Sequence, residues 1–308
     1  MKFIQCKTTL FLILFFQFTS HTFGKNYHTD FWYYKEKIND GSVFELNLND
    51  FKNKLLQAPN ASERKPSDIV LFMPTSEGKK ISFRFYQNTV IHPNLAKKYP
   101  NIKTYVGIGL ENPTHRATVV LNRDKIIGSV DSNLKPSHFK SFNVQDRING
   151  IVVYNETIRN EETFCKTKNS VLETNREFPE CMGTEDPCYP AGTELVTYRF
   201  AAMVTEAVTN DAADGTIEGG LTWLVGSVAY VNSLYVRDVS FQLQIVENND
   251  ELIFTNDNPA PDVFNQDCGD GWATLGCELG VVDSVLDARI GSGGWDSSDE
   301  ERLWDYGA

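Results

Sequence analysis

The residues with chemistry to offer are a few histidines and cysteines, and their spacing limits what the chain can do. No histidine follows His138, and no H-E-x-x-H sequence occurs. That spacing would place two imidazoles one helical turn apart on zinc, with the glutamate between them as general base. No Gly-x-Ser-x-Gly elbow, phosphate loop or dinucleotide fingerprint is present either. The sequence therefore offers no catalytic residues and no recognisable metal motif.

Five cysteines lie beyond the N-terminal segment, and each is a candidate for a disulfide if the protein is exported. Their odd number leaves at least one without a partner in this chain. The last two are nine residues apart, which is not the C-x-x-C spacing of a metal site, so a local disulfide is the better interpretation. The candidates are Cys165, Cys181, Cys188, Cys268 and Cys277.

Other polar residues have simpler interpretations. His92 and His115 are far apart and have no acidic or cysteine partner at a useful spacing, so we interpret them as ordinary surface or partly buried histidines. The run 247–270 is rich in Asn and Asp but lacks the spacing of a calcium loop. We expect a solvated connection there.

The N-terminus is typical of an exported protein. Lys2 and Lys7 precede an apolar run at residues 10–18, and a small-residue end at 22–24 follows it. Such a run is too short to span a bilayer and indicates a cleavable signal peptide over residues 1–24. We therefore expect a secreted protein with no membrane segment after signal cleavage.

Composition sets the remaining limits. The chain has 308 residues, of which 41% are hydrophobic, enough for two domains with real cores. Its net charge of −12 argues against nucleic acid or an anionic membrane surface as a partner. A solvated acidic surface is the expected consequence.

The elements that would position any site fall into two regions. Residues 25–157 are predicted to be strand-rich, and residues 158–192 form a polar, proline-containing stretch suited to an exposed linker. Strands are predicted near residues 69–73, 81–85, 103–108, 117–121, 125–130 and 150–154, with a hairpin connection at 75–78 and a short helix at 94–99.

From residue 193 the pattern changes to α/β. A strand is predicted at 196–202, a turn at 211–215, an apolar helical stripe from 217 to 235, and a second strand at 241–245. A second helical stripe covers 279–290 and ends at Gly291. The whole chain is therefore predicted to be α+β, with helices packed on a sheet in residues 193–308.

Particular sequences add a family resemblance. Residues 90–107 combine Leu95, Tyr99-Pro100 and Tyr105-Val106-Gly107 at a characteristic spacing, and residues 198–202, 231–238 and 241–247 follow in order. Together they resemble the propeptide and the first strand, helix and second strand of the catalytic domain in secreted bacterial zinc metalloproteases of the reprolysin-like type. The likeness covers roughly residues 42–290, and residues 304–307 look like the start of the next strand.

The resemblance implies a secreted zinc metalloendopeptidase precursor. It implies a propeptide, then the N-terminal part of a zincin-like catalytic domain that stops before the zinc-binding helix. In the intact enzyme, zinc-activated water would hydrolyse protein or peptide substrates, and an activating protease would cut the 158–192 linker. No residue here inherits the zinc-ligand or general-base role, so this chain is expected to be inactive.

One residue has a special role under that resemblance. Cys181 lies beside Gly183 between the two regions, where related zymogens place a thiolate on the open coordination position of zinc. A disulfide with Cys188 or Cys165 is the alternative, and export favours it. A different class of function also stays open: a non-enzymatic secreted binding or inhibitory module made of a propeptide and a partial protease-like domain.

Overall fold

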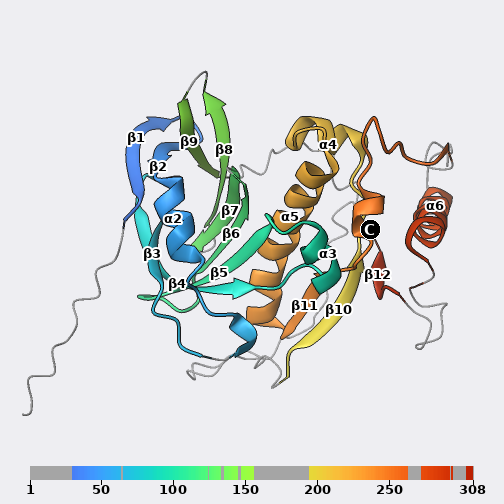
Figure 1. The fold of residues 1–308 in the computed structure, drawn as a ribbon, viewed down its shortest axis with the longest axis horizontal. Helices are drawn as coiled ribbons and strands as arrows, with labels where there is room; N and C mark the ends of the chain where they lie inside the picture. Colours follow the sequence, from blue (N-terminus) through green and yellow to red (C-terminus); the bar gives the residue numbers. More distant parts are fainter. Residues whose placement is uncertain are drawn as a thin grey trace, which may run out of the picture.

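The computed structural model describes residues 30–63, 65–123, 125–132, 135–144, 147–155, 194–262, 272–291, 293 and 303–307. The predicted signal peptide 1–24 and linker 158–192 lie outside these residues. The described chain is a mixed α+β structure with a curled nine-stranded antiparallel sheet and a small parallel sheet (Figure 1). In Figure 1 the layers run from the large sheet through helix α5 and the small sheet to helix α6.

The large sheet is built almost entirely from consecutive strands. Its order is β1-β2-β9-β8-β7-β6-β5-β4-β3, so β3 to β9 form one meander and the N-terminal hairpin β1-β2 pairs with β9. All neighbours are antiparallel. The strands are β1 (Trp32–Ile38), β2 (Gly41–Leu46), β3 (Val70–Pro74), β4 (Lys80–Asn88), β5 (Lys103–Gly109), β6 (Arg116–Asn122), β7 (Lys125–Ser132), β8 (Lys135–Val144) and β9 (Arg147–Asn155).

Alternation along the strands gives the sheet two different faces. In β6, Ala117, Val119 and Leu121 point into one core, while Val120 points to the opposite face and belongs to another. This is the period of two expected for side chains on a strand. The sheet therefore has a hydrophobic inner face and a second, partly apolar outer face.

The inner face curls around a short amphipathic helix, α2 (Leu48–Leu55). Its buried residue Phe51 meets Trp32 edge-to-face at 5.6 Å, and Trp32 also meets Phe139 at 5.8 Å. Edge-to-face packing suits the ring quadrupoles and adds to the burial of large apolar area. This aromatic core belongs wholly to residues 30–155. Two further short helices of this region are η1 (Ala61–Glu63) and α3 (Pro93–Lys98).

Residues 194–307 form the smaller sheet, in the order β11-β10-β12 with parallel pairing throughout. Parallel neighbours need a crossover, and α5 connects β10 to β11 in that way. The elements are β10 (Val196–Ala201), α4 (Glu206–Ala212), α5 (Ile217–Asp238), β11 (Phe241–Ile245), η2 (Asn249–Leu252), α6 (Trp272–Ile290) and β12 (Tyr306–Gly307).

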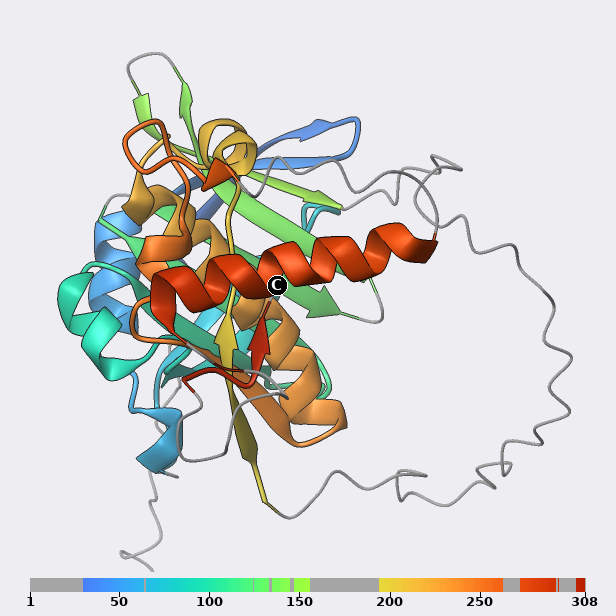
Figure 2. The ribbon, with the colours of Figure 1, turned by 90° about the vertical axis from the view of Figure 1, so that its right-hand side faces the viewer.

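Helices cover both faces of the small sheet. Helix α5 starts at the N-cap Thr216, whose Oγ1 accepts a 3.0 Å hydrogen bond from the backbone N–H of Gly219, as N-cap threonines do. Helix α6 lies against the other face (Figure 2), where Leu286 and Ile290 share a core with Phe254 and Trp304. No helix among the described residues has the length and apolar composition needed to cross a membrane.

Most strands and long helices agree with the sequence predictions, including the beginning of a strand at 306–307. The predicted turn at 211–215 is wrong in part, because residues 211 and 212 complete helix α4. Thr205 caps that helix and Thr209 is buried against α5, so tertiary packing extends a helix whose sequence has little apolar periodicity. Strands β1, β2 and β8 and helices α2 and α4 were not predicted.

Candidate functional site

The residues proposed from the sequence for metal or disulfide chemistry are not assembled into a site by the described structure. Cys165, Cys181, Cys188 and Cys268 lie outside the described residues. Cys277 belongs to helix α6, although its side chain is not described. Across the described part of the chain, no group of three His, Cys, Asp or Glu residues could hold a metal ion.

The two histidines considered earlier have local structural partners. The Nδ1 of His92 accepts a hydrogen bond from the backbone N–H of Asn94 at 3.3 Å and so caps helix α3. His115 lies 3.2 Å from the side-chain amide of Asn112 in the β5–β6 connection. Both side chains are partly buried, and a carboxylate oxygen of Glu247 lies 3.6 Å from Nδ1 of His92.

What the structure does assemble is an extensive interface between the outer face of the large sheet and residues 194–307. Helix α5 lies across β5, β6 and β7 and separates the two sheets (Figure 1). Gly226 permits the close approach, because a Cβ there would come within 2.6 Å of the Ile127 side chain on β7. The helix therefore packs on both sheets at once.

The centre of this interface is apolar. One continuous core joins residues from both regions, with Val90, Ile91, Leu95, Ile102 and Val120 from the first and the α5 stripe and neighbouring strands from the second. Residues of the second region in this core are Ala202, Val204, Leu221, Leu224, Val225, Val228, Ala229, Ile245 and Ile253. Neither region can bury these side chains by itself.

A backbone pairing adds to the apolar contact. The N–H of Ile245 donates to the carbonyl of Val90, and the N–H of His92 donates to the carbonyl of Ile245, both at 2.8 Å. Ile91 thus forms a parallel bridge with Ile245 on the open edge of β11. Because an open edge otherwise leaves unpaired backbone groups, the segment before helix α3 closes the small sheet on this side.

A buried carboxylate fixes the same corner. The side chain of Asp250 is only 6% exposed. Its carboxylate forms an ion pair with Lys98 and accepts a 3.0 Å hydrogen bond from the hydroxyl of Tyr99. Burial and the hydrogen bond to Asp250 raise the pKa of Tyr99 well above its ordinary value. Next to this pair, the side-chain amide of Asn94 donates to Glu247 at 2.7 Å.

A second polar group surrounds the N-terminus of α5. Lys125 meets Asp214 at 2.6 Å and Arg123 meets Glu218 at 2.7 Å, while the amide of Asn122 donates to Thr222 at 2.8 Å. Burial opposes ionisation of Asp214, but hydrogen bonds from Lys125 and from Thr216 outweigh it and lower the pKa of this carboxyl.

Arg237 forms the third polar group at the other end of α5. Its guanidinium contacts Asp131 of β7 at 3.2 Å, the carbonyl of Thr114 at 3.1 Å and the neighbouring Asp238 at 2.6 Å. The hydrogen bond to Arg237 lowers the pKa of Asp238, in spite of partial burial, while burial and Arg237 lower the pKa of Arg116. Arg237 therefore bridges the two regions.

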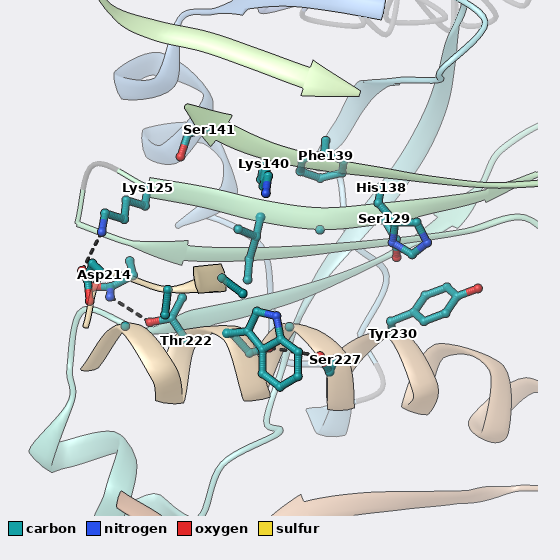
Figure 3. Close-up of a pocket in the computed structure, with 18 of the residues that line it drawn as sticks. Lys125, Ser129, His138, Phe139, Lys140, Ser141, Asp214, Thr222, Ser227 and Tyr230 are labelled. Carbon is teal, nitrogen blue, oxygen red and sulfur yellow. Dashed lines mark hydrogen bonds and ion pairs between the residues drawn. The ribbon is translucent and has the colours of Figure 1, made fainter. Parts of the chain in front are cut away.

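Where the large sheet curls away from α5, a groove of about 690 Å³ remains. The Lys125–Asp214 pair lies at one end, and His138 of β8 and Tyr230 of α5 meet edge-to-face at 5.2 Å at the other (Figure 3). The groove between them is lined by rings, hydroxyls and the exposed Lys140. These groups can stack on and hydrogen-bond a ligand.

The interface was missed in the sequence predictions, although one signal for it is present in the composition. Residues 30–155 contain 18 Lys and Arg and 12 Asp and Glu, a net charge of +6. Residues 194–308 contain 4 Lys and Arg and 21 Asp and Glu, a net charge of −17. Opposite net charges on two halves of one chain indicate electrostatic attraction between them.

Comparisons with known proteins add no family to this geometry. No protein-family model matches the chain, and no curated protein sequence matches it significantly. Its function is therefore inferred from its residues and their arrangement.

Proposed function

We propose that the chain is part of a secreted zinc-dependent metalloendopeptidase precursor of the reprolysin-like type. Residues 25–157 are the propeptide, 158–192 the linker that an activating protease cuts, and 193–308 the first part of a zincin-like catalytic domain. The observation that supports this most is the course of the chain through the small sheet. Strand β10, helix α5, strand β11, helix α6 and strand β12 follow in the order that the resemblance implies.

The position of β12 is the most specific part of that support. Tyr306 and Gly307 pair in parallel with Phe200 and Ala201 of β10, on the side opposite β11. Asp305 fastens this segment, because its carboxylate accepts hydrogen bonds from the backbone N–H of Arg199 at 2.7 Å and from its guanidinium at 2.9 Å. A third strand therefore begins where the family resemblance places one.

The residues present do not fit a zinc site. The chain has no histidine after His138, and none of its described residues form a cluster able to hold a metal. Zinc ligands and a general base would have to come from sequence outside residues 1–308. Cys181 as an inhibitory zinc thiolate, with a disulfide as its alternative, is part of this proposal and lies outside the described residues.

The interface is consistent with a propeptide that assists folding. Residues 30–155 supply apolar side chains to a core that residues 194–307 share, and they close the edge of β11. Without them, the α5 stripe and an open strand edge would face water, which promotes aggregation. Under this proposal the propeptide keeps the enzyme inactive, and cutting the linker allows it to leave, so that protein or peptide substrates gain access.

The proposal is tested by sequencing the coding region beyond codon 308. An in-frame H-E-x-x-H sequence downstream of β12 would support the precursor. A stop codon directly after Ala308 would refute the peptidase function for this product. In parallel, zinc is titrated into the purified chain: we expect neither stoichiometric binding nor hydrolysis of a fluorogenic peptide, and robust hydrolysis would overturn the assignment.

A second function is favoured by one feature of the fold. The α5 stripe and the β11 edge are already covered within the chain, which removes two surfaces that would otherwise promote aggregation. This supports a non-enzymatic secreted binding or inhibitory module. A monodisperse monomer in analytical ultracentrifugation, together with a stop codon after Ala308, would favour this function over the precursor.

A further inference from the structure

The interface around α5 combines an apolar centre with an ionic rim. Among the described residues, four ion pairs of Lys or Arg cross it. Three place the cation on the large-sheet side, and the fourth has the charges reversed: Lys98–Asp250, Arg123–Glu218, Lys125–Asp214 and Arg237–Asp131. The net charges of +6 and −17 on the two regions act in the same direction. Such a surface resembles the interface between two associating proteins, with a hydrophobic core and a polar rim.

Only the peptide linker joins the two regions covalently. Residues 30–155 contain no cysteine, so no disulfide can connect them to residues 194–308. After a cut before Cys165, the contacts across the interface would be all that keeps the regions together. Those contacts include the shared core and the Ile91–Ile245 backbone bridge, which do not depend on the linker.

We propose that residues 30–155 stay bound to residues 194–307 after the linker is cut, and that ionic strength controls their release. The partner of the large sheet's outer face is thus a separate, strongly acidic α/β unit. Cutting the linker is one step and dissociation is a second. This proposal holds whether or not a zinc motif follows, and it adds a release step if the chain is a protease precursor.

Salt sensitivity follows from the exposure of the rim. The side chains of Arg123 and Lys125 are 66% and 48% exposed, so solvent ions reach both of their ion pairs. Screening shortens the range of such interactions from about 14 Å at low salt to about 3 Å near 1 M. The apolar centre is not weakened in this way, so the complex is expected to persist at low salt and to loosen as salt rises.

The experiment uses the whole chain with a recognition site for a sequence-specific protease inserted after Asn160, ahead of Cys165. The protein is folded, cut and diluted in series on a size-exclusion column at about 0.05 M and about 1 M salt. We expect the two pieces to elute together at low salt and their dissociation constant to rise about tenfold or more at high salt. Separation at low salt, aggregation of the cut protein, or equal affinity at both salts would each overturn the proposal.

A charge-reversal pair locates the effect at the rim. Arg123→Glu with Lys125→Glu alters two interface cations, whereas Lys35→Glu with Lys79→Glu alters two exposed lysines whose partners Glu45 and Glu77 lie in the same region. Both doubles change the net charge equally, and circular dichroism before cutting checks that each folds.

At low salt we expect the dissociation constant of the interface double variant to be about tenfold higher than that of the control double variant. This difference should be lost near 1 M salt. The control double should behave much more like the wild type. Equal weakening by both doubles would show that net charge alone, and not these rim pairs, controls release.

Discussion

Ile91 offers the sharpest test of whether residues 30–155 stabilise elements more than a hundred residues downstream. Its side chain is 5% exposed and belongs to the core shared with α5 and β11. Ile91→Ala removes these methyl groups but keeps the backbone bonds of Val90 and His92 to Ile245. Truncation of a buried isoleucine costs about 3 kcal/mol, through lost burial and the cavity left behind.

The loss should be uneven across the molecule. The inner core of the large sheet contains no residue of the shared core, so the exchange of its strands should change little. Strand β11 and helix α5 depend on the shared core. Hydrogen exchange followed by mass spectrometry should therefore show amides of 217–245 exchanging about a hundredfold faster, as a 3 kcal/mol lower opening free energy requires.

Ile108→Ala is the matched control, because Ile108 lies on neighbouring strand β5 and is 36% exposed. Its expected effect is below about 1 kcal/mol, as for surface substitutions away from special features. Unchanged exchange of β11 in Ile91→Ala would refute the shared core. Equal acceleration in all strands of the large sheet would refute its independence from that core.

Three further substitutions probe single groups. Asn249→Ala should lower the free energy of unfolding, measured by urea titration, by about 3 kcal/mol. The reason is that Asn249 is fully buried and both of its hydrogen bonds to the backbone of Ala202 are lost. The control Asn256→Ala, at an exposed position, should have little effect. The pKa of Asp214 is lowered from 3.8, so its stabilising contribution is complete above that pH and is lost as pH falls through the lower folded-state pKa. Asp214→Asn should therefore make the acid decline of stability shallower, and an unaltered decline would contradict the assigned pKa. Burial raises the pKa of Tyr105 from 10.0 to about 12. The contribution of the neutral tyrosine to stability is therefore complete below pH 10 and is lost as pH rises through about 12. Tyr105→Phe should move alkaline unfolding, measured by circular dichroism, to higher pH.

Local sequence predicted those elements whose side chains repeat regularly. In strand β4, Ile81, Phe83 and Phe85 alternate with the residues between them, and α5 carries an apolar stripe over its whole length, so each shows its own period. Strand β1 was missed because all its residues after Trp32 are exposed. Strand β1 forms because it pairs with β2, and the residues of β1 alone do not predict that pairing.

The candidate site divides in the same way. The absence of H-E-x-x-H and of any histidine after His138 could be read directly, because metal ligation requires particular residue types. The packing of α5 between two sheets could not be read, since hydrophobic stripes show that a face is buried and do not name the surface that covers it.

The sequence by itself thus determined the types and order of most elements, the lack of a zinc motif and the opposite charges of the two regions. Only the tertiary structure decided that the outer face of the large sheet covers α5, that Ile91 closes the edge of β11, and that Asp250 receives Lys98 and Tyr99. The physical reason is range. Periodicity and composition are properties of neighbouring residues, whereas these contacts join residues about 100 to 150 positions apart and exist only once both surfaces have formed.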